Sequence, residues 1–270
     1  MILKTFWLLP LVMLYAASCS DSKKSNPNDE SESEQTLRIM TYNIHHANPP
    51  SKANLIDIQA IAGVIRKENP DLVALQEVDV FTERSGKNLH QAKELAEILD
   101  MEYYFVKALD YQGGLYGNAV LSRFSILDSL SIQLPTMEGV EAENRVWAGI
   151  KFDIDGNEMW FGSTHLDFNR GENNLQQAQT MLRNLESIEI PVIIGGDFNR
   201  TEDSETIRLY DTQFQRTCYE CPPTIPVTNP NKTIDFLMYR NQDDFQVVSH
   251  KVVDEQYASD HLPVVAELSF

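Results

Sequence analysis

A short apolar run that ends in an acid and an amide, residues 191–199, constrains the fold more than any other part of this chain. It reads PVIIGGDFN, and aliphatic letters followed by glycines are typical of a buried strand bounded by turn formers. The glycines allow a tight turn or the close approach of a ligand. On an extended chain Asp197 and Asn199 would point to the same side, which suits a hard cation or an oriented water molecule. The pair equally fits an Asx-type turn that closes the strand.

From residue 36 onward the hydrophobic pattern predicts many strands and a few helices. Strands are expected near residues 37–44, 71–78, 103–106, 119–122, 125–134, 146–154, 158–165, 191–197, 234–239, 245–252 and 262–268. Helices are expected near residues 56–66, 89–99, 175–188 and 204–210. This pattern fits two packed sheets with helices outside them, which is a layered α/β sandwich.

The composition limits the partners that the protein can have. The chain has 270 residues and a formal net charge of −18, so it is long enough for one large core and strongly acidic. An acidic surface repels phosphate backbones at long range, which argues against tight nonspecific binding of duplex DNA. It does not exclude a phosphate that is bridged by a cation, because the ion supplies the positive charge.

The first 18 residues have the pattern of an export signal. Lys4 precedes an apolar run that is too short to span a membrane comfortably. The run ends in the letters AASC, which resemble the lipobox of bacterial lipoproteins and make Cys19 the expected site of lipid attachment. An ordinary cleaved signal with an incidental cysteine is the alternative. Residues 19–35 are polar and predict a flexible tether, so the folded domain is expected over residues 36–270.

Two further cysteines, Cys218 and Cys221, stand in a proline-rich segment. A zinc site would need a second ligand pair nearby, and none is evident. In an exported protein we expect the two thiols to form a local disulfide.

Six expected strands begin or end with a polar residue of a kind that is unusual in a hydrophobic core. These residues are Asn43, Glu77, His165, Asp197, Asp235 and the neighbouring pair Asp260 and His261. Each has an ordinary alternative as a turn, a cap or an interior histidine. Asp235 is harder to explain in that way, because an unpaired carboxylate within an apolar strand is costly. Together the six indicate a functional site.

In this order and context the segments resemble the endonuclease/exonuclease/phosphatase superfamily of metal-dependent phosphoesterases. The resemblance runs from residue 37 to residue 270. It is carried by the letters GDFN at 196–199 and SDHLP at 259–263, with support from TYN at 41–43 and QE at 76–77. It implies a four-layer α/β sandwich with two packed, mostly antiparallel sheets flanked by helices.

The resemblance implies a site for Mg²⁺ or Mn²⁺. Glu77 would be the main carboxylate ligand, with Asn43 beside it, and Asp260 would add a second carboxylate to the ion or its water shell. Oxygen ligands of this kind are what Mg²⁺ prefers.

It also implies catalytic roles for five residues. Asp197 would orient or deprotonate the attacking water, and Asn199 would hold that water or a phosphate oxygen. His261 would act with Asp235 as a hydrogen-bonded pair, and His165 would donate to a nonbridging phosphate oxygen. The resemblance leaves open whether Asp197 or His261 is the base.

Four residues are candidates for substrate binding. Tyr116 and Asn118 lie in the segment GGLYGN, which would line the phosphate pocket or form a glycine-rich hairpin. Arg84 and Arg145 would clamp a phosphate or form surface ion pairs.

Together these observations lead to the hypothesis that the protein is a divalent-metal-dependent hydrolase of a phosphoester. The expected substrate is a phosphodiester of a small molecule or lipid headgroup. We expect a monomer that is held by a lipid anchor at a membrane of the bacterial cell envelope. A secreted nuclease and a noncatalytic metal- or phosphate-binding module on the same fold are the alternatives.

Overall fold

Two six-stranded sheets form the centre of the protein. In this computed structural model the described residues are 2 and 35–270. The first sheet has the order β11 (Gln246–Val252), β12 (Val264–Ser269), β1 (Thr36–Asn43), β2 (Leu72–Val80), β4 (Gly114–Ser122), β3 (Glu102–Tyr111). The second has the order β5 (Asp128–Leu134), β6 (Arg145–Ile154), β7 (Asn157–His165), β8 (Val192–Asp197), β10 (Asp235–Arg240), β9 (Phe214–Arg216).

The expected signal, Cys19 and the tether lie outside the described residues, apart from Ile2 and Gln35. Within the described part of the chain no helix is both long and apolar enough to cross a membrane.

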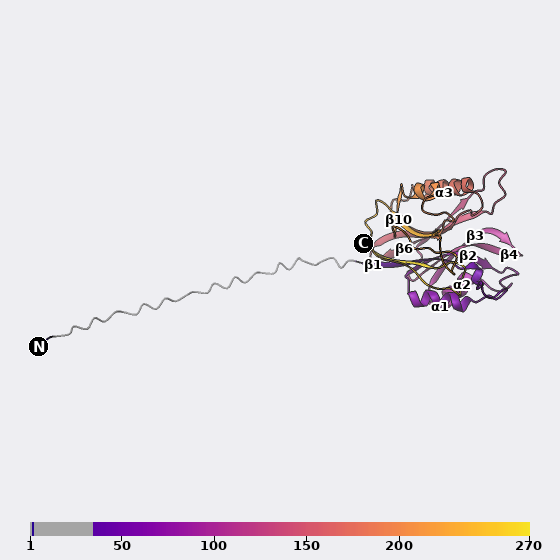
Figure 1. Ribbon diagram of the computed structural model, residues 1–270, viewed down its shortest axis with the longest axis horizontal. Coiled ribbons are helices and arrows are strands. Elements are labelled where there is room, and N and C mark those ends of the chain that lie inside the picture. Colours follow the sequence, from indigo (N-terminus) through magenta and orange to yellow (C-terminus); the bar gives the residue numbers. More distant parts are fainter. Residues whose placement is uncertain (1, 3–34) are drawn as a thin grey trace. The chain divides into compact units, whose positions relative to one another are not determined.

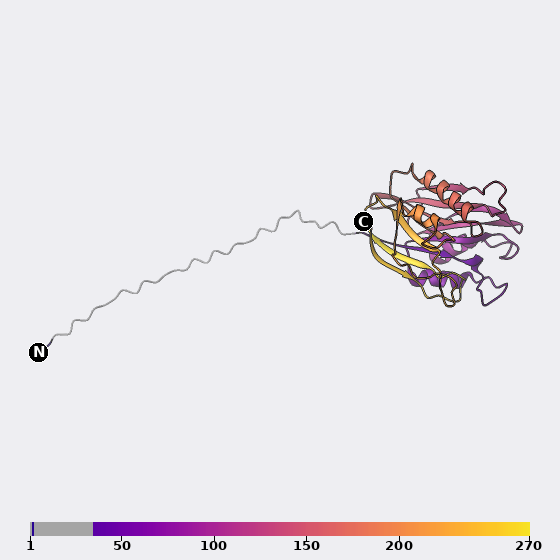
Figure 2. The same cartoon turned by 45° about the horizontal axis from the view of Figure 1, so that its top comes forward.

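Helices cover the outer faces of both sheets, so the expected four-layer α/β sandwich is confirmed (Figures 1 and 2). Helices α1 (Ile58–Glu68) and α2 (Gln91–Leu99) pack on the first sheet. Helices α3 (Gly171–Leu185) and α4 (Glu205–Tyr210) pack on the second. A third apolar layer lies between the sheets and contains side chains such as Ile39, Phe161 and Ile193, all fully buried.

Each sheet has one parallel pair at its centre, and its other pairs are antiparallel. Strands β1 and β2 are parallel, as are β7 and β8. In both cases a helix makes the crossover, α1 in the first sheet and α3 in the second. Parallel strands end at the same edge of a sheet, so the residues at their carboxyl ends are brought side by side.

The two glycines of the opening run serve packing rather than a turn. Both lie inside β8. A Cβ on Gly195 would lie 2.9 Å from the Cβ of Ala74 in the other sheet. A Cβ on Gly196 would lie 2.5 Å from the carbonyl oxygen of Thr164 in the neighbouring strand. These contacts leave room only for hydrogen at both positions.

Several elements differ from the sequence-based expectation. Strands β3 and β4 form one long hairpin over residues 102–122, closed by Gln112 and Gly113 at positive φ, where only short strands were expected. Strand β9 was not expected, and neither was the 3₁₀ turn η1 (His45–Ala47). Both have only three residues, too few for a hydrophobic period to show. The disulfide between Cys218 and Cys221 is present, as expected.

Trp147 of β6 depends on two facing glycines. Its indole is fully buried, and Gly149 and Gly162 are register partners beside it. A Cβ on Gly162 would lie 2.3 Å from the indole ring. The tryptophan therefore fills a space that these glycines leave open.

We expect Gly162→Ala to lower the free energy of unfolding by about 1–3 kcal/mol or more, because the added methyl group overpacks the indole. Urea denaturation followed by tryptophan fluorescence measures this. Gly63→Ala in α1 is the control, since its Cβ would have no atom within 4 Å and alanine is preferred in a helix by about 1 kcal/mol. A Gly162→Ala protein as stable as the wild type would contradict the packing argument.

Candidate active site

The topology gathers the polar strand ends at one edge of the sandwich. Asn43 ends β1, and its register partner in β2 precedes Glu77. His165 and Asp197 are register partners at the ends of β7 and β8, and Asp235 pairs with Asp197 from the antiparallel β10. His261 lies just before β12. The structure thus brings residues far apart in the sequence into one cluster.

A cavity of about 300 Å³ opens beside this cluster. Its walls are formed by Leu109, by Asn199 and by charged, aromatic and histidine side chains: Glu77, Arg84, Tyr111, Tyr116, Glu143, Arg145, His165, Phe168, Asp197 and His261. Asn43, Asn118, Asp235 and Asp260 are expected site residues that do not line it. The cavity is small and polar, as suits a small charged group.

Asp197 lies at the centre of the cluster and is buried. Its Oδ2 accepts a hydrogen bond from the Asn43 amide at 3.0 Å. The Nε2 atoms of His165 and His261 lie 3.6 and 3.7 Å from the same oxygen. Burial and the nearby charge of Asp235 raise the pKa of Asp197 to about 7. A carboxylate with this pKa can take up and release a proton near neutral pH.

Asn199 does not continue the strand. Strand β8 ends at Asp197, and Asn199 has a left-handed backbone with φ of 52°. Its backbone N–H donates to Asp197 Oδ1 at 2.8 Å, and its side-chain amide donates to the carbonyl of Leu166. The expectation of an extended chain was therefore wrong, because the Asx turn forms. The turn and the site are not alternatives, since both residues also line the cavity.

His261 and Asp235 form a buried pair. The Nδ1 atom of His261 lies 3.0 and 3.1 Å from the two carboxylate oxygens of Asp235. Thr224 also donates to this carboxylate. Burial lowers the pKa of His261, but Asp235 and Asp197 outweigh it and raise the pKa to about 10. The imidazole is therefore protonated at neutral pH.

His165 has the opposite electrostatic environment. Burial and the neighbouring Arg145 guanidinium hold the pKa of His165 well below its usual value. Arg145 NH1 donates to His165 Nδ1 at 3.2 Å, so the ring proton lies on Nε2. His165 is a neutral donor directed toward Asp197.

Arg145 forms neither an exposed ion pair nor a clamp that is free to bind phosphate. Its side chain is 2% exposed, forms an ion pair with Glu143 at 3.1 Å and has an Nε atom that finds no hydrogen-bond partner among the described residues. Arg84 reaches the cavity but is bound in bidentate fashion to the buried Asp79 at 2.7 and 2.9 Å. Its guanidinium lies over the ring of Tyr111 at 4.4 Å.

Tyr116 and Asn118 have different positions on β4. Tyr116 lines the cavity, whereas the amide of Asn118 is buried and donates to the carbonyl of Val146 at 2.9 Å. Asn118 therefore joins the two sheets behind the site.

Glu77 has a strained backbone at the cavity rim. Its φ is 58°, at the point where the pairing of β2 with β4 shifts register. Its Oε1 accepts a hydrogen bond from Asn43 at 3.2 Å. Burial raises the pKa of Glu77, but His46, His165 and Asn43 outweigh burial and lower it. Glu77 is therefore ionised at neutral pH, and an ionised carboxylate at a cavity fits a divalent cation.

The other two expected ligands fit a cation less directly. The Asn43 nitrogen faces Glu77 and Asp197, and its oxygen accepts from the backbone of His45. Coordination by Asn43 would require the amide to rotate. Asp260 is half-exposed and lies 4.0 Å from His45, on the side of η1 rather than in the cavity wall.

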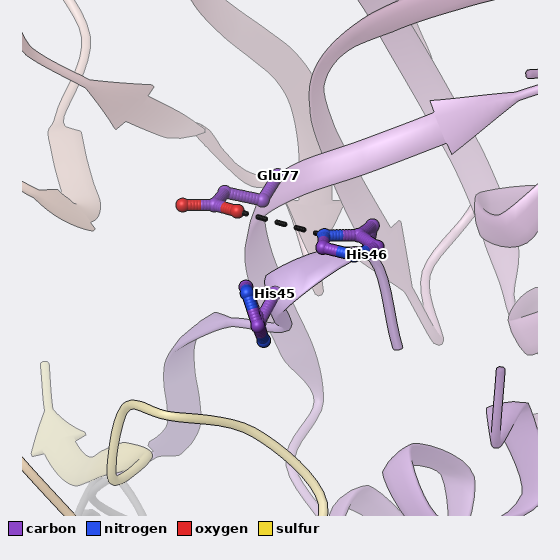
Figure 3. Close-up of side chains that lie close together, drawn as sticks. All are labelled: His45, His46 and Glu77. Atoms are coloured by element: carbon purple, nitrogen blue, oxygen red, sulfur yellow. Dashed lines mark ion pairs between the residues drawn. The ribbon is translucent and has the colours of Figure 1, made fainter. Parts of the chain in front are cut away.

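Six residues of the site were missed in the sequence, namely His45, His46, Leu109, Tyr111, Glu143 and Phe168. His45 and His46 directly follow the TYN letters, and this doubled histidine at a strand end was the available signal. Figure 3 shows both rings beside Glu77. Tyr111 and Phe168 line the cavity but look like ordinary strand and loop aromatics, so the sequence gives no signal for them.

Comparisons with known proteins agree with this fold. A YbhP protein of Escherichia coli, described as uncharacterized, is 24% identical over 247 residues, which are 86% of this chain and 96% of that protein. An endonuclease/exonuclease/phosphatase structure from Beutenbergia cavernae has a TM-score of 0.73 at 25% identity and covers 87% of this chain and 72% of its own. A mannosyl-6-phosphatase of Bacteroides thetaiotaomicron has a TM-score of 0.71 at 21% identity, over 87% of this chain and all of its own.

The catalytic domain of human nocturnin, with bound sulfate, has a TM-score of 0.69 at 23% identity and covers 88% of this chain and 97% of its own. At 21% and 23% identity, the mannosyl-6-phosphatase and nocturnin structures show the fold alone. The sequence matches the Endonuclease/Exonuclease/phosphatase family over residues 40–261, which is most of the chain. The chain therefore belongs to the endonuclease/exonuclease/phosphatase family, whose members hydrolyse phosphoesters.

Proposed function

We propose that this protein hydrolyses a phosphoester of a small molecule or lipid headgroup, through attack by water and with a divalent cation, Mg²⁺ or Mn²⁺. The observation that carries the proposal is the position of Asp197, which lies between a neutral histidine and a protonated one and shares the Asn43 amide with the ionised Glu77. Phosphoryl transfer needs a proton acceptor for the water and donors for the charge that builds on phosphate oxygens. The cluster offers both within one cavity.

In this proposal Glu77 and Asp260 hold the cation, with Asn43 after rotation of its amide. The cation neutralises phosphate oxygens when it is bound. Carboxylate oxygens support this role, since they are the ligands that Mg²⁺ prefers.

Asp197 is the proposed base. A base works best when its pKa is near the pH of the reaction, and the pKa of Asp197 is raised to about 7. His261 is less suited, because Asp235 keeps it protonated. His261 and His165 instead donate hydrogen bonds to phosphate oxygens or to the leaving group.

The shape and charge of the cavity support a small substrate. Its volume is about 300 Å³, and Arg84, Tyr111 and Phe168 line it beyond the catalytic cluster. The net charge of −18 disfavours duplex DNA. Among similar folds, one is named a mannosyl-6-phosphatase, which supports a phosphate on a small polar group.

We expect hydrolysis to require both the cation and the cluster. A panel of phosphodiesters, phosphomonoesters, sphingomyelin and DNA, tested with Mg²⁺ and Mn²⁺, should show turnover that is lost with EDTA. Glu77→Gln and His261→Gln should each lower kcat/KM by about 100-fold or more. Glu83→Gln is the control, since Glu83 is exposed and forms its ion pair with Lys87, away from the cavity lining. Undiminished turnover in either cluster variant would contradict the proposal, as would preferred cleavage of DNA for the substrate class.

The pH profile of kcat/KM should be bell-shaped. Activity rises as Asp197 loses its proton near pH 7, and it falls as His261 loses its proton toward pH 10. Because the charge of Asp235 raises both pKa values, Asp235→Asn should move both limbs to lower pH. Asp128→Asn, at an exposed position on β5, is the control. Limbs that stay in place or move to higher pH in Asp235→Asn would contradict the assignment.

The sequence of residues 1–19 supports a lipid-anchored setting at the cell envelope, and we further propose that the enzyme is a monomer. The letters AASC resemble a lipobox. We expect Cys19→Ser to shift the protein from the membrane fraction to the soluble fraction after export. Immunoblotting of fractionated cells measures this, and full retention of the variant in membranes would contradict the anchor.

A further inference from the structure

Two histidines stand next to the proposed active site without a role in the chemistry described above. His45 and His46 form the turn η1, which follows directly after β1. Each offers a ring nitrogen, and together with a carboxylate oxygen of Glu77 these three atoms all lie within 4.8 Å of one another. Figure 3 shows the two rings and the carboxylate converging from the turn and from β2.

The backbone of η1 is held in a strained conformation. His45, His46 and Ala47 have φ values of 44°, 43° and 57°, so three consecutive residues with side chains are left-handed. Each such residue costs about 1–2 kcal/mol. Gln91 of α2 donates to the carbonyl of His46 at 2.6 Å and keeps the turn in place. Strain that the surroundings maintain in this way is typical of a functional site.

The surroundings also orient the ring of His45. Its Nδ1 lies 2.9 Å from the backbone carbonyl of Asn48. Since a carbonyl can only accept, Nδ1 carries the single proton of the neutral ring, which places the lone pair on Nε2. A ring N–H bound to a backbone carbonyl is the usual environment of a metal-binding histidine.

The ring of His46 has a buried nitrogen that makes no hydrogen bond within the described part of the chain. This atom, Nδ1, lies 3.9 Å from Glu77 Oε2. This distance is too long for a hydrogen bond. A cation between the two atoms would satisfy both.

We propose that His45, His46 and Glu77 bind a divalent transition-metal ion and that they bind Zn²⁺ in preference to Mg²⁺. Two imidazoles and one carboxylate, with a further position open, are a ligand set that Zn²⁺ adopts in proteins, whereas Mg²⁺ prefers oxygen. Ligand atoms around a tetrahedral Zn²⁺ lie ~3.3 Å apart, from bond lengths of ~2.0–2.1 Å. Side-chain rotations that shorten the separations from at most 4.8 Å to this value would close the site.

The site is adjacent to the proposed oxygen-ligand position and shares one residue with it. Glu77 Oε1 faces Asn43, and Oε2 faces His46. One carboxylate can thus contact both positions. The inference shares Glu77 with the proposed hydrolysis but does not rest on it, since the imidazoles bind a metal whether or not a phosphoester is cleaved.

Metal binding tests the inference without an activity assay. Metal-stripped protein is titrated calorimetrically with Zn²⁺ and with Mg²⁺, and Co²⁺ is used as a coloured probe whose visible absorption reports nitrogen ligands. The test variants are His45→Asn and His46→Asn, because asparagine tolerates the left-handed backbone and should leave the metal-free fold intact. Thermal unfolding of the metal-free proteins checks this.

Two matched variants serve as controls. His261→Asn removes a ligand from the other cluster that could hold a metal, Asp197, Asp235 and His261. His250→Asn removes a histidine on β11 that contacts Thr217 instead.

We expect the wild type to bind Zn²⁺ at least about 100-fold more tightly than Mg²⁺, with a visible Co²⁺ spectrum. His45→Asn and His46→Asn should weaken Zn²⁺ binding by about 100-fold or more, which exceeds the loss of an outer-shell partner, and His250→Asn and His261→Asn should retain it. Equal affinity for the two ions would overturn the inference, as would a loss that follows His261 instead of His46. Zn²⁺ binding without hydrolysis would support the site and count against the proposed function alone.

Discussion

A single amide joins the two halves of this site. Asn43, at the end of β1 in the first sheet, donates from one nitrogen to Glu77 of its own sheet and to Asp197 of the second. Two carboxylates facing one cavity repel each other, and the amide offsets part of that repulsion while it fixes their spacing. The pKa of Glu77 is lowered and that of Asp197 is raised, so the two acids have different protonation behaviour although they share a donor. That difference is what allows one to remain charged while the other exchanges a proton.

The fold brings Asn43 to Asp197 because the same strand arrangement occurs in each sheet. A parallel pair with a helical crossover places two strand ends side by side, and the sheets pack so that both pairs end at the same edge. Close packing beside the site depends on Gly195, whose hydrogen lies against Ala74 of the other sheet. Gln76 adds a polar contact across the same layer, since its amide donates to Ser163 Oγ at 2.9 Å. The positions of the reacting groups are therefore set by the layer between the sheets.

Much of this arrangement could be predicted from the sequence because it follows from local patterns. Apolar runs that end in Asn43, Glu77, His165 and Asp197 mark strands and their ends, and the layered sandwich follows from them. What could not be predicted depends on backbone conformations and contacts between distant segments. Asn199 turns into the left-handed region, where an extended chain was expected. Arg145 looks like a surface charge in the sequence but is buried against His165. The strained turn at His45 and His46 is too short for a hydrophobic periodicity to appear in the sequence.

The burial of Gln76 between the sheets has a consequence for how the protein responds to change. Glu77 of the first sheet and Asp197 of the second lie close enough to form one site because the apolar layer between the sheets has a fixed thickness. A substitution that swells or thins this layer, for example at Ile150 or Ile193, both fully buried, would alter the distance between Glu77 and Asp197 without touching either residue. The activity of the site therefore depends on how closely the two sheets pack against each other.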